Sequence, residues 1–168
     1  NMPLNPEISR FIREHLDDNP DQLLWKKNEY PDDRVVVAVE QIQARENIKE
    51  KLPSWYACRD IFYPSKLSTE QCSSETTAPY KARLTTGNSL CDLTGGLGVD
   101  TYFFSRQVDK VTYVERDKSY CEAARFNFLA LGATNIEVIH ADATTVANQV
   151  IADTYYICLL YTSPSPRD

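Results

Sequence analysis

The stretch N-S-L-C-D-L-T-G-G-L-G-V-D over residues 88–100 decides the fold. A short apolar run ends in Asp92, a turn containing Gly95, Gly96 and Gly98 follows, and a helical pattern begins directly after the last glycine. This order is typical of α/β domains that hold a nucleotide-like ligand, because glycines let backbone approach the ligand and the new helix offers free N–H groups. The stretch therefore predicts the ligand-binding corner of an α/β sheet.

Two further strands keep the order that such a sheet requires. Residues 111–114 alternate like a strand that ends at Glu115, about twenty residues after the glycine loop. A helical pattern covers residues 117–131, and a third strand pattern at 136–139 is followed by Asp142 and Ala143. Ligands of open α/β sheets bind at the carboxyl ends of the strands. We therefore expect acidic side chains from three strand ends to share one site.

Two ligand classes compete for this pattern. The dinucleotide fingerprint G-x-G-x-x-G/A would begin at Gly96 and Gly98, but Thr101 stands where its third glycine belongs. An acid directly before the loop is also foreign to that fingerprint. The arrangement instead resembles class I methyltransferases that use S-adenosylmethionine. That resemblance places the loop along the methionine portion, the second acid at the ribose and the third at the adenine. The predicted cofactor-binding residues are Asp92, Thr94, Gly95, Gly96, Gly98, Asp100, Glu115, Asp142 and Ala143.

Each of these residues also has a purely structural interpretation. The glycines can form a tight turn without a ligand, Asp100 can cap its own helix, and Asp142 can cap the helix after Ala143. Upstream, Gln71, Ser73 and Ser74 either lie over the cofactor or only cap and pack a helix.

Upstream segments resemble one bacterial family more closely. The segments at 67–75, 77–78 and 80–82, together with 44–55 and 92–100, are similar to class I methyltransferases with a helical N-terminal part and a THUMP-like C-terminal domain. The likeness covers nearly all of residues 3–157. The core is also similar to trimethylguanosine synthases and predicted RNA methylases. The resemblance implies RNA, ribosomal or transfer, as the substrate class, and nothing in the composition shows it.

The predicted fold class is α/β, with a helical N-terminal domain followed by a truncated Rossmann-like methyltransferase sheet. Asn5-Pro6 and Asn19-Pro20 are helix start signals, and helical patterns continue to residue 84. We place the helical domain at 1–66 and an incomplete cofactor-binding domain at 67–157.

The last residues depart from the family. After Ile157 the family continues with Asp-Pro-Ala-Arg, whereas residues 158–168 read C-L-L-Y-T-S-P-S-P-R-D. This string resembles the translation of a transposase-based sequencing adaptor, so we expect an artefactual tail on a truncated chain. The alternative is a genuine Pro/Ser-rich tail. Because the fourth motif of the family is absent, no catalytic residue is named, and this chain alone is expected to transfer no methyl group.

Composition restricts the partners. The net charge is −6, which does not favour nucleic-acid binding over the whole surface. The five cysteines form no C-x-x-C pair, so we expect neither a metal nor a disulfide framework. No apolar run reaches membrane length, and no export leader stands at the start, so a cytoplasmic location is expected. Two other functions stay open: an NAD(P)-linked oxidoreductase, and a non-catalytic RNA-binding protein with a vestigial cofactor fold.

Overall fold

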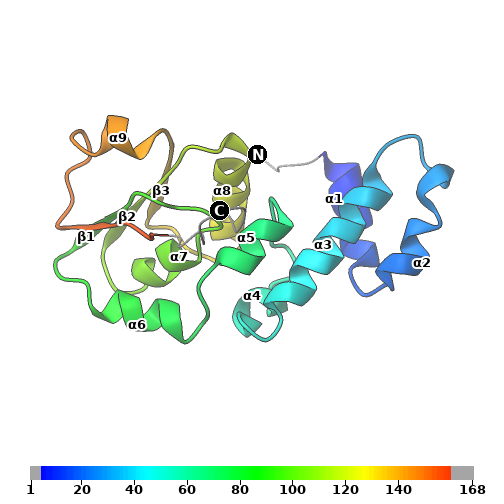
Figure 1. Cartoon of the computed structure of the whole chain (residues 1–168), viewed down its shortest axis with the longest axis horizontal. Coiled ribbons are helices and arrows are strands. Elements are labelled where there is room, and N and C mark those ends of the chain that lie inside the picture. Colours follow the sequence, from blue (N-terminus) through cyan, green and yellow to red (C-terminus); the bar gives the residue numbers. More distant parts are fainter. Residues whose placement is uncertain (1–4, 160–168) are drawn as a thin grey trace, which may run out of the picture.

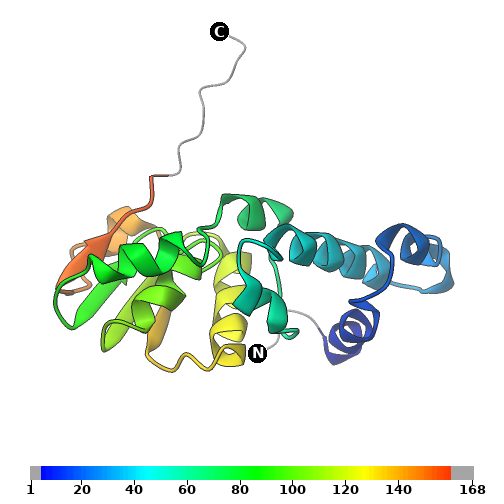
Figure 2. The same cartoon turned by 90° about the horizontal axis from the view of Figure 1, so that it is seen from below.

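The computed structural model describes residues 5–159 and has helices at one end and a sheet at the other (Figure 1). Residues 160–168 of the predicted tail, and residues 1–4, lie outside the described residues. Seen from below, the helical residues 5–65 extend from the α/β part as an arm (Figure 2). Within residues 5–159, no helix is both long enough and apolar enough to cross a membrane.

The helical arm begins where the sequence signals predict. Asn5 caps the first helix by accepting a 2.8 Å hydrogen bond from the N–H of Ile8, and Asn19 caps the second in the same way, each with a proline at the first helical position. The helices of the arm and of the entry to the sheet are α1 (Pro6–His15), α2 (Pro20–Leu24), the 3₁₀ helix η1 (Lys27–Glu29), α3 (Arg34–Ile48), α4 (Pro53–Ala57), α5 (Lys66–Gln71) and α6 (Thr77–Arg83).

The sheet contains four parallel strands in the order β3-β2-β1-β4. Parallel neighbours need crossover connections, which here pass through helices. The strand, glycine turn and helix start predicted from residues 88–100 are confirmed, as are the second and third strands. The elements are β1 (Ser89–Asp92), α7 (Val99–Ser105), β2 (Lys110–Glu115), α8 (Lys118–Ala130), β3 (Ile136–His140), α9 (Ala143–Val146) and β4 (Thr154–Tyr156).

Alternating side chains of β2 divide the core into two layers. Tyr113 packs with Cys121 and Phe128 of α8, on the face that α7 also covers. The next residue, Val114, packs on the other face with Val146 of α9. This two-residue period is what a strand buried on both faces requires.

The core continues from the sheet into the arm. Trp55 of α4 is fully buried and joins Ile48 of α3 with Leu97 and Val99 of the sheet part in one cluster. Its ring meets that of Tyr102 edge-on, with centroids 6.1 Å apart. Packing thus crosses the predicted boundary after residue 66, and the division into two domains stays a prediction.

Candidate functional site

A cavity of about 370 Å³ opens at the carboxyl ends of β1, β2 and β3. Its wall contains every residue of the segment 93–100, the end of β2, the start of α9 and the end of α5. Of the nine predicted cofactor-binding residues, eight line it: Thr94, Gly95, Gly96, Gly98, Asp100, Glu115, Asp142 and Ala143. The topology therefore brings the predicted residues together, with one exception.

The exception is Asp92, which lies beneath the loop and not in the cavity wall. Its side chain is buried, with Oδ2 accepting a 2.7 Å hydrogen bond from the Thr101 hydroxyl and Oδ1 accepting a 3.0 Å bond from the N–H of Thr94. Burial raises the pKa of Asp92 to about 6, while the bonds from Thr101 and Thr94 act in the opposite direction. Asp92 therefore fixes the loop between strand and helix.

Each of the three loop positions requires glycine for a different physical reason. A Cβ on Gly95 would overlap the ring of Tyr113, and one on Gly98 would lie 2.7 Å from Cζ of Phe128. Only at Gly96, where φ is +57°, would an added Cβ clash with no atom, because its nearest neighbour would be a backbone oxygen 3.7 Å away. Two glycines thus let the loop pack on the protein's own aromatic rings, and one leaves the cavity wall bare.

Glu115 ties the second strand end to the glycine loop. Its Oε1 accepts a 3.1 Å hydrogen bond from the N–H of Gly96, and its Oε2 accepts a 2.7 Å bond from the N–H of Asp117. A carboxylate has about four acceptor positions, so both oxygens can accept further bonds from a ligand. The side chain is thereby fixed in the wall while keeping acceptor capacity.

Asp142 caps a helix at the edge of the cavity. It lines the cavity and caps α9, because Oδ1 accepts bonds of 2.8 Å from the N–H and 2.7 Å from the hydroxyl of Thr144. These bonds hold the pKa of Asp142 below its usual range. Both capping bonds go to Oδ1, which leaves Oδ2 as an acceptor for a ligand.

Asp100 lies in the first turn of α7 and lines the cavity near β4. Its Oδ2 accepts a 2.8 Å hydrogen bond from the hydroxyl of Tyr156 and is 3.5 Å from Nζ of Lys81. Among the described residues, no hydrogen-bond donor contacts its buried Oδ1. The start of α7 has no side-chain capping bond, so Asp100 connects the cavity to β4 and does not cap its own helix.

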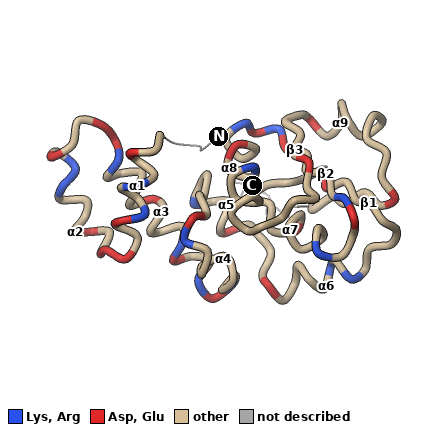
Figure 3. The backbone as a smooth tube through the Cα atoms, turned by 180° about the vertical axis from the view of Figure 1, so that it is seen from behind, with Lys and Arg blue, Asp and Glu red and all other residues tan. Residues whose placement is uncertain are grey.

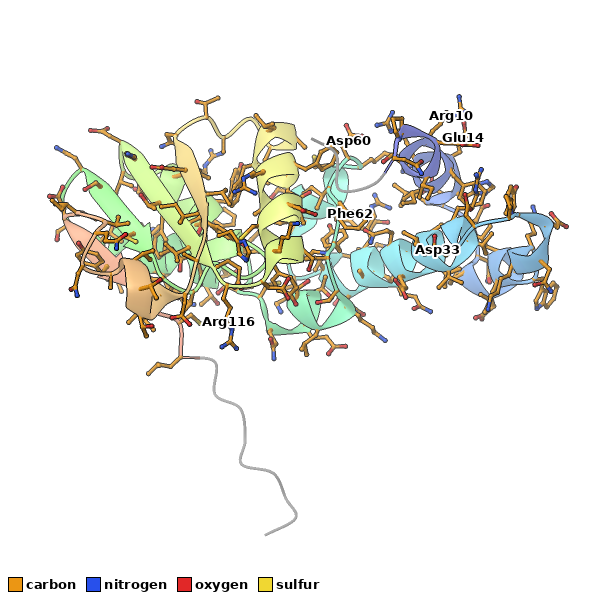
Figure 4. The ribbon with its side chains drawn as sticks, turned by 90° about the horizontal axis from the view of Figure 1, so that it is seen from above. Arg10, Glu14, Asp33, Asp60, Phe62 and Arg116 are labelled. Carbon is orange, nitrogen blue, oxygen red and sulfur yellow. The ribbon has the colours of Figure 1, made fainter. Side chains whose placement is uncertain are left out.

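Other residues of the cavity wall lie in segments whose sequence pattern indicates helix capping or packing. Gln71 and Ser73 line the cavity, whereas Ser74 turns to the Thr77 hydroxyl at the start of α6. Arg116, directly after Glu115, lies in the wall and extends outward in Figure 4. Tyr120 belongs to the apolar stripe of α8, yet it reaches the cavity and hydrogen-bonds Ser65 at 2.6 Å. No group of three or more metal-ligating side chains occurs within residues 5–159.

Comparisons with family models and with curated proteins give no match to this chain. Among solved structures, the chain is similar to MtNAS in complex with MTA and tNA at 18% sequence identity and a TM-score of 0.47, over 90% of this chain and 61% of that chain. A similarity this low decides nothing about the fold.

A second solved structure is much closer. The chain is similar to a putative methyltransferase from Porphyromonas gingivalis W83, with 29% sequence identity and a TM-score of 0.78. The similarity covers 90% of this chain and 39% of that chain, so this chain spans less than half the length of the structure it matches. The chain has the Rossmann-like α/β fold of that protein.

Proposed function

We propose that the cavity binds S-adenosylmethionine and that the chain carries the cofactor-binding part of a methyltransferase. The observation that carries the proposal is the bond between the N–H of Gly96 and Glu115, which joins a bare glycine loop to an acid on the next strand. Asp142 stands at the third strand end of the same cavity. The similarity to a putative methyltransferase supports the same assignment.

Each part of the wall suits one part of this cofactor. Glu115 can accept hydrogen bonds from the ribose hydroxyls, and Oδ2 of Asp142 can accept one from the adenine amine. The bare face at Gly96 admits the methionine portion. The cofactor supplies an activated methyl group, so the contribution of the chain is to bind and orient it. No catalytic residue is assigned.

Calorimetric titration of the full chain with S-adenosylhomocysteine and, separately, with NADH tests the assignment. Binding of S-adenosylhomocysteine without binding of NADH is the expected result. A preference for NADH would instead support the oxidoreductase alternative. Thr101 argues against that alternative, since its side chain fills the place of the third glycine and bonds Asp92.

RNA is proposed as the methyl acceptor, and this rests on the similarity of the methyltransferase core to trimethylguanosine synthases and predicted RNA methylases. Charge gives it no support, because Lys and Arg are mixed with Asp and Glu along the arm (Figure 3). Sequencing the source locus past the codon for Ile157 establishes which residues the gene encodes downstream. Tritiated S-adenosylmethionine with total RNA then tests that gene product. Label in RNA supports the proposal, whereas RNA binding without label favours the non-catalytic alternative.

A further inference from the structure

Lys81, in the last turn of α6, joins four segments of the chain through one ammonium group. Its Nζ donates hydrogen bonds to Oγ of Ser73 at 2.9 Å and to the hydroxyl of Tyr156 at 3.2 Å, and it is 3.5 Å from Oδ2 of Asp100. The Tyr156 hydroxyl donates in turn to the same carboxylate oxygen at 2.8 Å. Ser73, Lys81, Asp100 and Tyr156 together form the Lys81 cluster.

The cluster is more shielded from solvent than a surface ion pair. The side chain of Asp100 is 12% exposed and that of Lys81 is 29% exposed. A buried carboxylate is costly unless a cation or hydrogen-bond donors compensate its charge. Lys81 and the Tyr156 hydroxyl provide this compensation at Oδ2. In the described part of the chain, Oδ1 of Asp100 is buried without any donor.

The position of the cluster relates it to the cavity. Ser73 and Asp100 line the cavity, and Lys81 contacts both of them without being a lining residue itself. The cluster lies beside β4, at one end of the strand order, whereas Asp142 follows β3 at the other end. One end of the cavity therefore presents the carboxylates of Glu115 and Asp142. The other end presents the Asp100 carboxylate and the Ser73 hydroxyl, and both of these contact the Lys81 ammonium. That second set is complementary to a zwitterion.

We propose that Lys81 is a positioning residue for the amino-acid end of the bound cofactor, and this rests on the function proposed above. Lys81 holds the Asp100 carboxylate and the Ser73 hydroxyl in the cavity wall. There the carboxylate attracts an α-ammonium, and the positive charge behind it favours the neighbouring α-carboxylate. Lys81 thus acts through Asp100 and Ser73 and determines preference for ligands that carry an amino acid.

Two ligands separate this role from simple support of the fold. S-adenosylhomocysteine carries the amino acid, and 5′-methylthioadenosine has the same nucleoside and thioether without it. Lys81→Met should lower the affinity for S-adenosylhomocysteine about tenfold or more. It should change the affinity for 5′-methylthioadenosine less than about twofold. Lys81→Arg should restore most of the affinity, because it keeps the charge. Lys110→Met is the matched control, since Lys110 is 63% exposed and pairs with Glu137 at 3.4 Å.

Each outcome decides something different. Equal losses for both ligands in Lys81→Met, or no loss for either, would overturn the positioning role. If wild-type protein binds neither ligand, the proposed function fails, and this inference fails with it. Should Lys81→Met not fold, Tyr156→Phe replaces it, because it removes the hydroxyl of the cluster and keeps the ring against Phe104. Its loss should again be confined to the ligand with the amino acid.

Discussion

The hydroxyl of Thr101 donates a 2.7 Å hydrogen bond to Oδ2 of Asp92 inside the protein. Both side chains are buried, at 0% and 1% exposure, so the bond fixes the first helix after the glycine loop to the strand before it. The N–H of Thr94 holds the other carboxylate oxygen. The acid before the loop thus shapes the ligand site from below, without lying in its wall.

The free energy of unfolding should depend on pH through the protonation of Asp92. Burial raises its pKa from the usual 3.8 to about 6. A group with a raised folded-state pKa stabilises the fold most below its unfolded pKa, and this contribution is lost as the pH rises through the folded value. From about pH 3 to about pH 7, ionisation of Asp92 should therefore lower the free energy of unfolding by about 3 kcal/mol.

Asp92→Asn isolates this contribution, because an amide can keep partners at both Thr94 and Thr101. Urea unfolding of both proteins across this pH range gives the comparison. The stability of Asp92→Asn relative to wild type should rise with pH. Acids whose pKa is lowered, such as Asp142, affect both proteins alike. A difference that stays constant with pH would rule out a buried, titrating Asp92.

Gly96 and Gly132 form a matched pair for testing the bare cavity wall. Both have left-handed backbone, with φ at +57° and +75°, and neither has an atom that would clash with an added Cβ. Alanine at either position should cost about 1 kcal/mol of stability. Only Gly96→Ala should also lower the affinity for S-adenosylhomocysteine measured by calorimetry, because only that methyl group would enter the cavity. Equal affinities of the two variants would contradict a ligand lying on Gly96.

Gly95→Ala should act through the fold instead. The added methyl group would overlap the ring of Tyr113, which is buried and packs edge-on against Phe128 at 5.7 Å. Overpacking of this kind costs about 1–3 kcal/mol. Thermal unfolding should therefore show a lower midpoint for Gly95→Ala than for Gly96→Ala. The reverse order would contradict the assignment of the two glycines.

The local pattern around the glycine loop is what made the site predictable. Apolar alternation and strand length located β1, β2 and β3, and a parallel sheet then brings their carboxyl ends to one edge. The grouping of Glu115 and Asp142 with the loop follows from that topology alone. Helix start signals at Asn5 and Asn19 likewise depend only on neighbouring residues.

The features that the sequence did not predict depend on contacts between distant residues. Lys81 and Tyr156 are 75 positions apart, and no local pattern relates them. The packing of Gly95 against Tyr113 also requires the completed sheet. Asp92 has a spacing suited either to the cavity or to the turn beneath it, and only side-chain direction distinguishes the two. Hydrophobic periodicity predicts which face of a helix or strand is buried. It does not predict which distant side chains pack against that face.

Glu115 should affect the affinity for S-adenosylhomocysteine both by holding the glycine loop in place and by contacting the ligand directly. Its two oxygens accept the N–H groups of Gly96 and Asp117. Glu115→Gln replaces one acceptor with an amide donor, so one of these N–H groups loses its partner. S-adenosylhomocysteine should bind about 10- to 100-fold more weakly in calorimetry. Glu137→Gln is the control, because Glu137 is an exposed acid on the next strand. An equal loss in both variants would show a general charge effect.

Asn127 should couple the stability of the arm to that of the sheet. It is fully buried in α8, where its Nδ2 donates to the carbonyl of Phe62 and its Oδ1 accepts from the N–H of Phe62, both at 2.8 Å. Asn127→Ala leaves both backbone groups of Phe62 without these partners, which should cost about 2–4 kcal/mol in urea unfolding. Hydrogen exchange at the Phe62 amide should become faster. Asn135→Ala is the control, because Asn135 bonds carbonyls within the sheet part alone, including those of Ser105 and Val108. If Asn127→Ala speeds exchange throughout the arm and leaves the sheet as stable as in wild type, the two parts unfold independently. That outcome would support the predicted domain division after residue 66 and contradict a single cooperative core.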